Sequence, residues 1–293
     1  MNPSELPADG LLYNPDITTQ AEIDKYREFY RRTKGWSLPA FEFWLETRPD
    51  VLKRYRANFV RETTGIEERP RPLAHVLAML HHYGVVNFPE GVLYEIKLSR
   101  NEGATREEVL DTLALAFLNG NPWGAHGVAT SSLEYVKEWM AEPAAPSDKP
   151  NRWPAHWKFD PKAFDSGMDY STPEASSADM KRLREWYLDN LGELPGYVSF
   201  LMTHRPGFLK AYRNRMEHAI RDALPREMVP YCLLNLHVTR GFHEGVRESV
   251  LMGKWLGMTR CQLVDAITWA YYGGMGAISV AEEAAGDLLR SMD

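Results

Sequence analysis

The chain has 293 residues, about the length of two average domains. Its 34 lysine and arginine residues against 40 aspartate and glutamate residues give a formal net charge of −6. This charge argues against a nucleic-acid-binding protein, because such proteins usually carry a basic face. Hydrophobic residues make up 44% of the chain, so it can bury a core and is not disordered throughout. Two cysteines are too few for a disulfide framework or a cysteine-based zinc site.

The N-terminal residues lack the basic start and the apolar run of a signal peptide. No stretch of about 18 apolar residues is present that would span a membrane. We therefore expect a cytoplasmic protein with neither a membrane nor a nucleic acid as its partner.

The first half of the chain predicts three successive helices. Residues 73–83 form an apolar helix that ends near Gly84, and residues 89–101 form a second helix that stops at Gly103, where a left-handed residue is expected. The third helix begins with a capping box at residues 105–108 and continues with apolar residues at helical spacing.

The second half predicts the same order of elements. Residues 225–240 form an apolar helix with Pro225 in its first turn, and residues 243–256 form a helix that stops at Gly257. A second capping box, at residues 259–262, starts the third helix. The proline-rich segment between the two halves has no helical period and predicts an extended linker.

Matched segments indicate an internal repeat, which decides the fold prediction. Three pairs of segments match at a nearly constant offset: 48–56 with 205–213, 88–92 with 242–246, and 103–105 with 257–259. Signals for strands are scarce. We therefore predict an all-α protein of two tandem helical bundles related by internal duplication. The predicted parts are a first repeat with an N-terminal extension at residues 1–140, a linker at 141–178 and a second repeat at 179–293.

The order of these elements, with Gly-x-Thr before a capped apolar helix, resembles the carboxymuconolactone decarboxylase and alkylhydroperoxidase D superfamily. Residues 103–110 and 117–125 are especially similar to the motifs of that family, and residues 271–277 match them more loosely. The resemblance covers most of both halves. It implies that each half is an alkylhydroperoxidase D-like helical bundle.

The chain departs from this family at the residues of the peroxidase reaction. The positions of the family's Cys-x-x-Cys pair and of its later histidine are taken by Phe88, Gly91 and Glu95 in the first half and by Phe242, Gly245 and Ser249 in the second. Thiol-based peroxide reduction needs a thiolate and a resolving thiol, so we predict that this chain is not a thiol peroxidase.

The decarboxylase branch of the family works without cysteine, and the resemblance to it implies a cofactor-independent acid–base enzyme. We predict a decarboxylase-type lyase, with isomerisation and lactone hydrolysis as open alternatives. Its substrate would be a small carboxylated lactone or cyclic carbonyl compound, in aromatic-compound catabolism. Such chemistry needs a proton-transfer residue of near-neutral pKa, a carboxylate anchor and a largely dry pocket.

The second half carries the richer set of polar candidates, so we favour it as the active half. His237 is the predicted general acid or base, because imidazole is the usual proton carrier near pH 7. His243 and Glu244 are candidate catalytic partners, and Arg240 is the candidate anchor for a substrate carboxylate. Stabilisation of helix ends is the plain alternative for each of them.

The first half offers a second set of candidates. Glu90 is the counterpart of Glu244 and a candidate catalytic carboxylate. Glu95 stands where the family has its histidine, and Tyr83 lies on the stripe that faces the family pocket. Trp123 and His126 follow the capped helix, where the family's chain approaches the pocket. We expect the last four residues to contact the substrate.

Two other classes of function stay open, a binding or scaffold protein on a degenerate peroxidase fold and a metal-dependent hydrolase. His81 and His82 are adjacent, and His237 and His243 are six residues apart, which is weak support for a metal site. We therefore expect neither a metal nor a cofactor. The expected partners are a small-molecule substrate and further copies of the chain, as a trimer in preference to a dimer.

Overall fold

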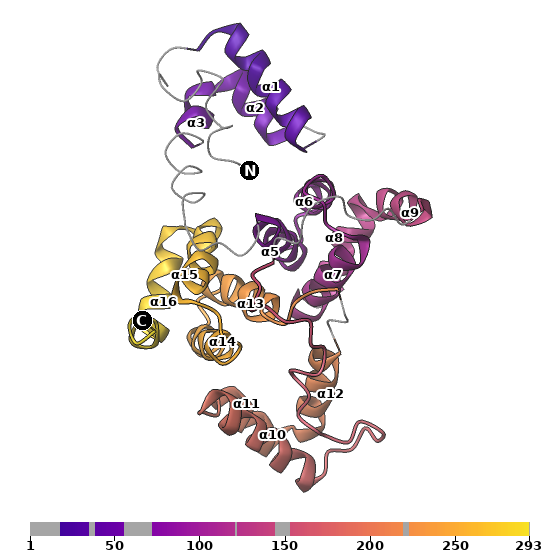
Figure 1. Cartoon of the computed structure of the whole chain (residues 1–293), viewed down its shortest axis with the longest axis vertical. Coiled ribbons are helices and arrows are strands. Elements are labelled where there is room, and N and C mark those ends of the chain that lie inside the picture. The colour runs from indigo at the N-terminus through magenta and orange to yellow at the C-terminus, as the bar shows by residue number, and fades with distance from the viewer. Residues whose placement is uncertain are drawn as a thin grey trace.

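The chain folds into helices, as shown in Figure 1, and the all-α prediction is confirmed. The computed structural model describes residues 18–34, 39–55, 72–120, 122–143, 153–218 and 223–292. The first half contains α1 (Gln20–Lys34), α2 (Pro39–Thr47), α3 (Pro49–Arg54), α5 (Pro72–Val85), α6 (Pro89–Asn101), α7 (Arg106–Gly120), α8 (Pro122–Ser131) and α9 (Leu133–Ala141). The second half contains α10 (Ser177–Leu191), α11 (Gly196–His204), α12 (Pro206–Glu217), α13 (Met228–Thr239), α14 (His243–Trp255), α15 (Arg260–Thr268), the 3₁₀ helices η3 (Trp269–Gly273) and η4 (Met275–Ile278), and α16 (Ser279–Arg290).

The six helices predicted around the two capping boxes are all present, and one boundary differs. The helix expected from Pro225 begins at Met228, so Pro230 is the proline in its first turn. A proline is tolerated there because the first N–H groups of a helix have no partner within the helix.

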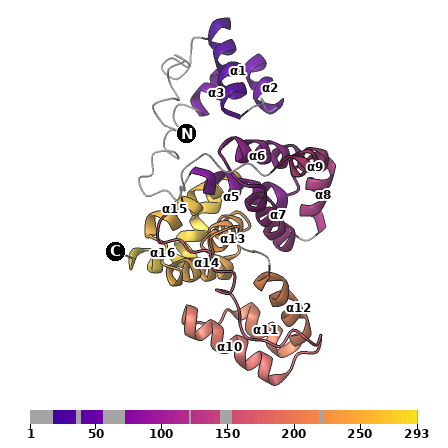
Figure 2. The ribbon, with the colours of Figure 1, turned by 45° about the vertical axis from the view of Figure 1, so that its right-hand side comes forward.

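The two halves share one core, with α5 packed against α13 at its centre. Leu77 and Leu80 of α5 and Leu234 and Val238 of α13 are fully buried. Figures 1 and 2 show α1–α3 at one end of the molecule and α10–α12 at the other, with the remaining helices between them. The two end groups flank a central body to which both halves contribute.

The turns between helices have the same geometry at matched positions of the two halves. Gly103 and Gly257 end α6 and α14 in the left-handed region, with φ of 85° and 83°. At the preceding turn, the N–H of Phe88 donates to Tyr83 O, and the N–H of Phe242 donates to His237 O, both at 2.9 Å. These turns agree locally between the halves, and the duplication itself stays a prediction.

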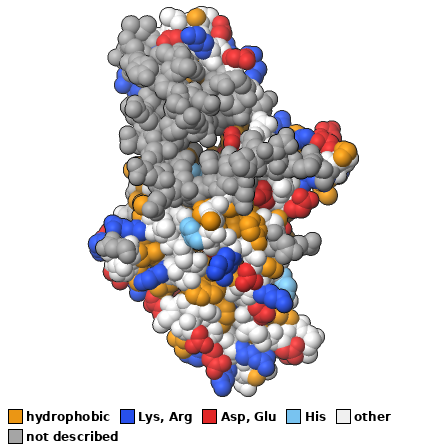
Figure 3. Space-filling view, viewed as in Figure 1, with side chains coloured by type: hydrophobic (Ala, Val, Ile, Leu, Met, Phe, Trp, Pro, Cys, Tyr) orange, Lys and Arg blue, Asp and Glu red, His pale blue; other side chains and the backbone are white. Residues whose placement is uncertain are grey.

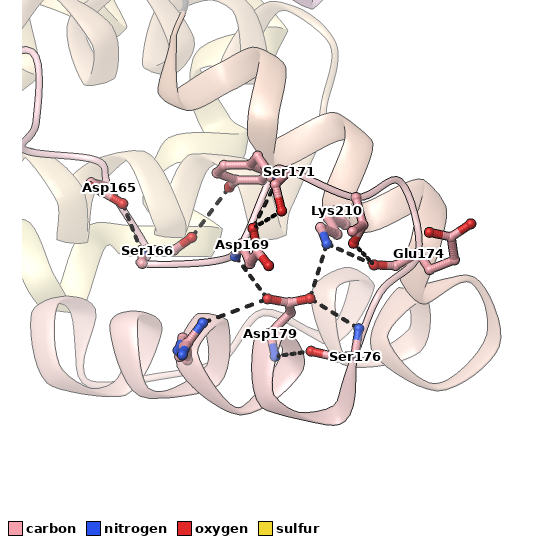
Figure 4. A network of polar contacts seen from close by, with 12 residues as sticks. Asp165, Ser166, Asp169, Ser171, Glu174, Ser176, Asp179 and Lys210 are labelled. Carbon is pink, nitrogen blue, oxygen red and sulfur yellow. Dashed lines mark hydrogen bonds and ion pairs between the residues drawn. The ribbon is translucent and has the colours of Figure 1, made fainter.

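Each end group contains a buried lysine. In the second half, Lys210 Nζ donates to Asp179 Oδ2 at 3.1 Å, and Asp179 also closes the capping box with Ser176, as Figure 4 shows. In the first half, buried Lys53 lies 3.5 Å from Glu22, which bonds to Thr19 in the same way at the start of α1. The local similarity of the halves thus extends to α1–α3 and α10–α12.

The described part of the linker packs onto both halves. The indole of Trp153 donates to Glu108 Oε1 at 3.1 Å, and the indole of Trp157 donates to Gln262 Oε1 at 3.4 Å. Glu108 and Gln262 are the last residues of the two capping boxes, at the third position of each helix. The two indole rings stack 5.6 Å apart, so the linker holds the starts of α7 and α15 together.

The surface shows charged side chains of both signs among hydrophobic ones (Figure 3). Within the described ranges, no helix has the length and hydropathy to cross a lipid bilayer.

Replacing Lys210 by alanine will lower the free energy of unfolding by about 3 kcal/mol, because Asp179 then keeps a buried charge without its cation. The loss is measured as the shift of the urea unfolding midpoint, with the slope of unfolding free energy against urea concentration unchanged. Lys181→Ala is the matched control, since this exposed lysine on α10 forms only a surface pair with Glu185. Equal shifts for the two variants would contradict the structural role of the buried pair.

Candidate functional site

The predicted second-half residues lie at the turn from α13 to α14. Gly241 adopts a φ of +66° in this turn, a left-handed conformation that favours glycine. The ring of His237 lies directly on the backbone of α14, since a Cβ atom added at Gly245 would be only 2.6 Å from His237 Nδ1. A glycine at this position therefore makes room for the imidazole.

Inside this turn, His237 is paired with Ser249. The distance from His237 Nδ1 to Ser249 Oγ is 3.1 Å, and the ring of Phe242 stands edge-on to the imidazole at 5.3 Å. A hydroxyl can donate or accept, so the pair fixes the ring orientation in either tautomer. Sequence analysis placed both residues at family pocket positions, and the structure brings them together.

The matched place in the first half is aromatic. Tyr83 stands edge-on to Phe88 at 5.2 Å, as His237 does to Phe242. Gly91 packs under the ring of Tyr83 in the same manner. The imidazole and hydroxyl pair therefore belongs to the second half alone, which agrees with the preference for that half.

Two further histidines lie where α5 meets the end of α13. His81 is fully buried, and its Nε2 atom lies 2.9 Å from the amide nitrogen of Asn119. An amide nitrogen only donates, so His81 Nε2 accepts and its ring proton is on Nδ1, which has no hydrogen-bond partner among the described residues. His82 is buried next to Asn235.

Burial keeps all three imidazoles neutral at pH 7. The pKa of His81 is lowered to about 3, mainly by loss of solvation and also by the neighbouring His82, His237 and Arg240. The pKa values of His82 and of His237 are lowered to about 4, mainly by loss of solvation, which outweighs hydrogen bonds from Asn235 and from the Gly245 backbone that raise them. Arg240 acts on all three groups, so its positive charge is close to the cluster.

The other predicted second-half residues have structural partners. Glu244 Oε2 accepts a hydrogen bond of 3.0 Å from the N–H of Tyr197 and thereby caps the start of α11. His243 Nε2 lies 2.9 Å from Glu283 in an exposed pair. Arg240 is exposed to solvent. For Glu244, the helix-capping alternative is thus the one that the geometry favours.

The first-half candidates occupy several separate surroundings. Glu95 is buried on α6, and Glu90 is exposed in the first turn of the same helix. Trp123 is 62% exposed on α8 and stands edge-on to the exposed ring of His126 at 6.2 Å. Tyr83 is half-buried beside Phe88.

Sequence analysis missed a buried polar cluster between the halves. Asp265 Oδ2 of α15 lies 2.9 Å from His75 Nε2 of α5 and accepts a hydrogen bond of 2.8 Å from the Tyr231 hydroxyl of α13. The ring of Trp269 covers His75 at 4.5 Å. A carboxylate that orients an imidazole is an arrangement found in acid–base sites. A signal was available, because Asp111 and Asp265 stand six residues after the capping threonine in both halves, within otherwise apolar helices.

The two cysteines do not form a reactive pair. Cys232 is buried in α13, and its burial raises the pKa of the thiol. Cys261 is exposed in the first turn of α15. The metal-dependent alternative gains no support, since no group of three or more His, Cys, Asp or Glu side chains within the described ranges is arranged to hold a metal ion.

Comparison with known proteins adds no identification: no protein-family model, no curated protein and no solved structure matches the chain.

Acidification from pH 6.5 to 4 will destabilise the fold through the three histidines. In this window the unfolded chain binds protons at imidazoles that the folded chain keeps neutral. The free energy of unfolding that depends on these histidines is therefore at its full value above pH 6.5 and decreases as the pH falls. In His81→Gln, the melting temperature will fall less steeply over this range than in the unaltered chain.

The comparison with the variant is needed because buried Glu227 and Glu248 have raised pKa values, which act in the opposite direction. His204→Gln, at an exposed position of α11, serves as the control and will keep the original slope. An unchanged slope in His81→Gln would rule out its assigned neutral state.

Proposed function

We propose that the chain is a cofactor-independent acid–base enzyme of the carboxymuconolactone decarboxylase type, with His237 as the group that transfers the proton. The observation that carries the proposal is the pair of His237 and Ser249 at 3.1 Å. The imidazole is half-buried and neutral at pH 7, so its free nitrogen can accept a proton, but burial lowers its pKa to about 4 and makes it a weaker base than a group of near-neutral pKa.

Ser249 would act as a positioning residue. If its hydroxyl accepts from Nδ1–H, then Nε2 is the free base; if it donates to Nδ1, then Nε2–H is a hydrogen-bond donor. In decarboxylation, the bond to the carboxylate breaks and carbon dioxide leaves, the electron pair of that bond enters the conjugated carbonyl group, and the carbon then takes a proton that the imidazole receives from water and passes on. The same imidazole would serve isomerisation, by removing and returning a proton at carbon, so the reaction type stays open.

Arg240 supports a carboxylated substrate. It is exposed, and its guanidinium lies close enough to His237 to lower the pKa of the imidazole. A substrate carboxylate bound to Arg240 would neutralise this charge and place the rest of the molecule beside the turn. The expected substrate is therefore a small cyclic carbonyl compound or lactone that carries a carboxylate.

A binding or scaffold protein is the second candidate, and one observation favours it. Glu244, a predicted catalytic partner, is engaged as the cap of α11, and His243 is engaged with Glu283. With both held in structural contacts, His237 would have no carboxylate partner at this turn.

Removal of the imidazole will distinguish the two candidates. With carboxylated lactones as substrates, His237→Ala will lower kcat by roughly 100-fold or more, because general acid–base catalysis contributes on the order of 100-fold to 10,000-fold. Ser249→Ala will lower kcat less and will shift the pH dependence of kcat/KM. His204→Ala, an exposed control, will keep full activity.

Unchanged turnover in His237→Ala would remove this residue from the mechanism. Binding of the same compounds without any turnover by the unaltered chain would favour the scaffold candidate.

Self-association is also a proposal. Several large apolar side chains are more than half exposed: Phe43, Trp123, Phe200, Phe208 and Met275. Exposed apolar side chains of this size favour contact with another chain. Light scattering at micromolar concentration measures the mass directly and separates a trimer from a dimer and from a monomer.

A further inference from the structure

A buried carboxyl group lies where the second end group, α10–α12, meets the central body. Glu248 of α14 is 8% exposed, and two tyrosine hydroxyls donate to it: Tyr187 of α10 to Oε1 at 3.1 Å and Tyr197 of α11 to Oε2 at 2.8 Å. The hydroxyl of buried Tyr187 also hydrogen-bonds with that of Tyr197. We call these three residues the carboxyl–tyrosine triad. Because α10 packs on α14, the triad lies on the boundary between the end group and the body (Figures 1 and 2).

The triad contains no cation. Among the described residues, no basic side chain lies within ion-pair distance of Glu248, since Arg213 is bonded to Glu217 at 3.1 Å and acts on Glu248 only from farther away. The titratable groups that face Glu248 are Tyr187 of α10, Tyr197 of α11, Tyr212 and Arg213 of α12, and Glu244 of its own helix. Burial raises the pKa of Glu248, against the two tyrosine hydrogen bonds and the charge of Arg213, which lower it.

The first half closes the matched place without a carboxyl group. At the offsets of the predicted repeat, the counterparts of the triad are Tyr30 of α1, Phe41 of α2 and Tyr94 of α6. Tyr30 and Phe41 stack at 4.7 Å, and Phe41 stands edge-on to Tyr94 at 6.2 Å. Aromatic rings are thus sufficient at these positions to pack an end group on the body. A buried carboxyl group is costly, so its presence in the second half alone points to a role other than packing.

The triad has a complete hydrogen-bond pattern for the neutral carboxyl group. Three groups with three protons can form a closed ring, from Glu248 to Tyr187, from Tyr187 to Tyr197 and from Tyr197 back to Glu248. Loss of the carboxyl proton leaves a buried charge with two hydroxyl donors and no cation in contact. Water solvates the same charge better, so ionisation favours a state in which α10 and α11 have moved away from α14.

We propose that the triad is a pH-sensitive latch, which holds α10–α12 on the central body while Glu248 keeps its proton and loosens when that proton is lost. A carboxyl group that ionises less readily in the closed state than in water makes opening more favourable as the pH rises. Opening therefore increases by up to about tenfold per pH unit above the ordinary pKa of glutamate, about 4.3. It levels off once the closed state ionises as well.

The latch borders the candidate site. The N–H of Tyr197 donates to Glu244, and its ring stands edge-on to Phe242 at 5.8 Å. Phe242 in turn lies 5.3 Å from the ring of His237. Loosening of α11 would therefore uncover the turn that carries His237. The latch follows from the contacts of Glu248 and does not rest on the proposed enzyme activity.

The test is amide hydrogen exchange of the full chain from pH 5 to 8, followed by mass spectrometry. Protection factors divide out the intrinsic exchange rate at each pH and report the local opening of each helix. We expect the protection of α10 and α11 to fall by roughly tenfold or more over this range. The helices α1 and α2 form the internal control, because aromatic rings stand at the matched positions there, and they will keep their protection.

Two variants identify the group that titrates. Glu248→Gln retains a donor and an acceptor for the two hydroxyls but cannot ionise, so the protection of α10 and α11 will not change with pH. Tyr197→Phe removes one donor to the carboxylate, so the fall will continue to a higher pH, and this variant decides the matter if Glu248→Gln does not fold. Glu193→Gln removes a partly exposed pair with Arg247 and will keep the original pH dependence.

The latch is overturned if the protection of α10 and α11 stays constant or rises between pH 5 and 8, or if α1 and α2 lose protection to the same extent. An equal fall in Glu248→Gln, or an unshifted one in Tyr197→Phe, would overturn it as well. Each of these outcomes leaves the proposed role of His237 untouched, because that role is measured by turnover.

Discussion

The packing of α5 against α13 is the constraint on which the rest of the structure depends. The two helices join the halves in one core, through fully buried leucines and valines. Every polar group placed in that contact must be paired or uncharged, because charges are costly in an apolar interior. His81 and His82 meet the condition by staying neutral, and Asp265 meets it by accepting a hydrogen bond from Tyr231 and lying 2.9 Å from His75 Nε2. These buried titratable groups therefore lie where the two halves are held together.

Local signals predicted the helices well, because these signals act over three or four residues. The capping box of residues 259–262 closes as expected, and Gly103 and Gly257 end their helices in the left-handed region. The start of α13 was placed three residues too early, because Pro225 and Pro230 both satisfy the same sequence rule.

Such local signals could not predict the contact partners of the candidate residues. Glu244 caps a helix through the N–H of Tyr197, 47 residues earlier in the chain, and Asp265 meets His75 only through the packing of α15 on the α5–α13 pair. Sequence spacing says nothing about contacts of this kind. The pairing of His237 with Ser249 was within reach, because both positions follow from the family resemblance, and only their distance needed the structure.

The stacked indoles of Trp153 and Trp157 lie in the segment that joins the two halves in one chain, and this connection lets the two capping boxes differ in sequence. In an assembly of two identical chains, every substitution at one capping box would appear at the other as well. Here one chain carries both, so Trp153 meets the glutamate Glu108 while Trp157 meets the amide of Gln262. The tether also keeps the two halves at a fixed and high effective concentration, independent of the amount of protein in solution. If the two halves are repeats as predicted, one half could change, with His237 where the other has Tyr83, while the other half continues to hold the shared scaffold in place.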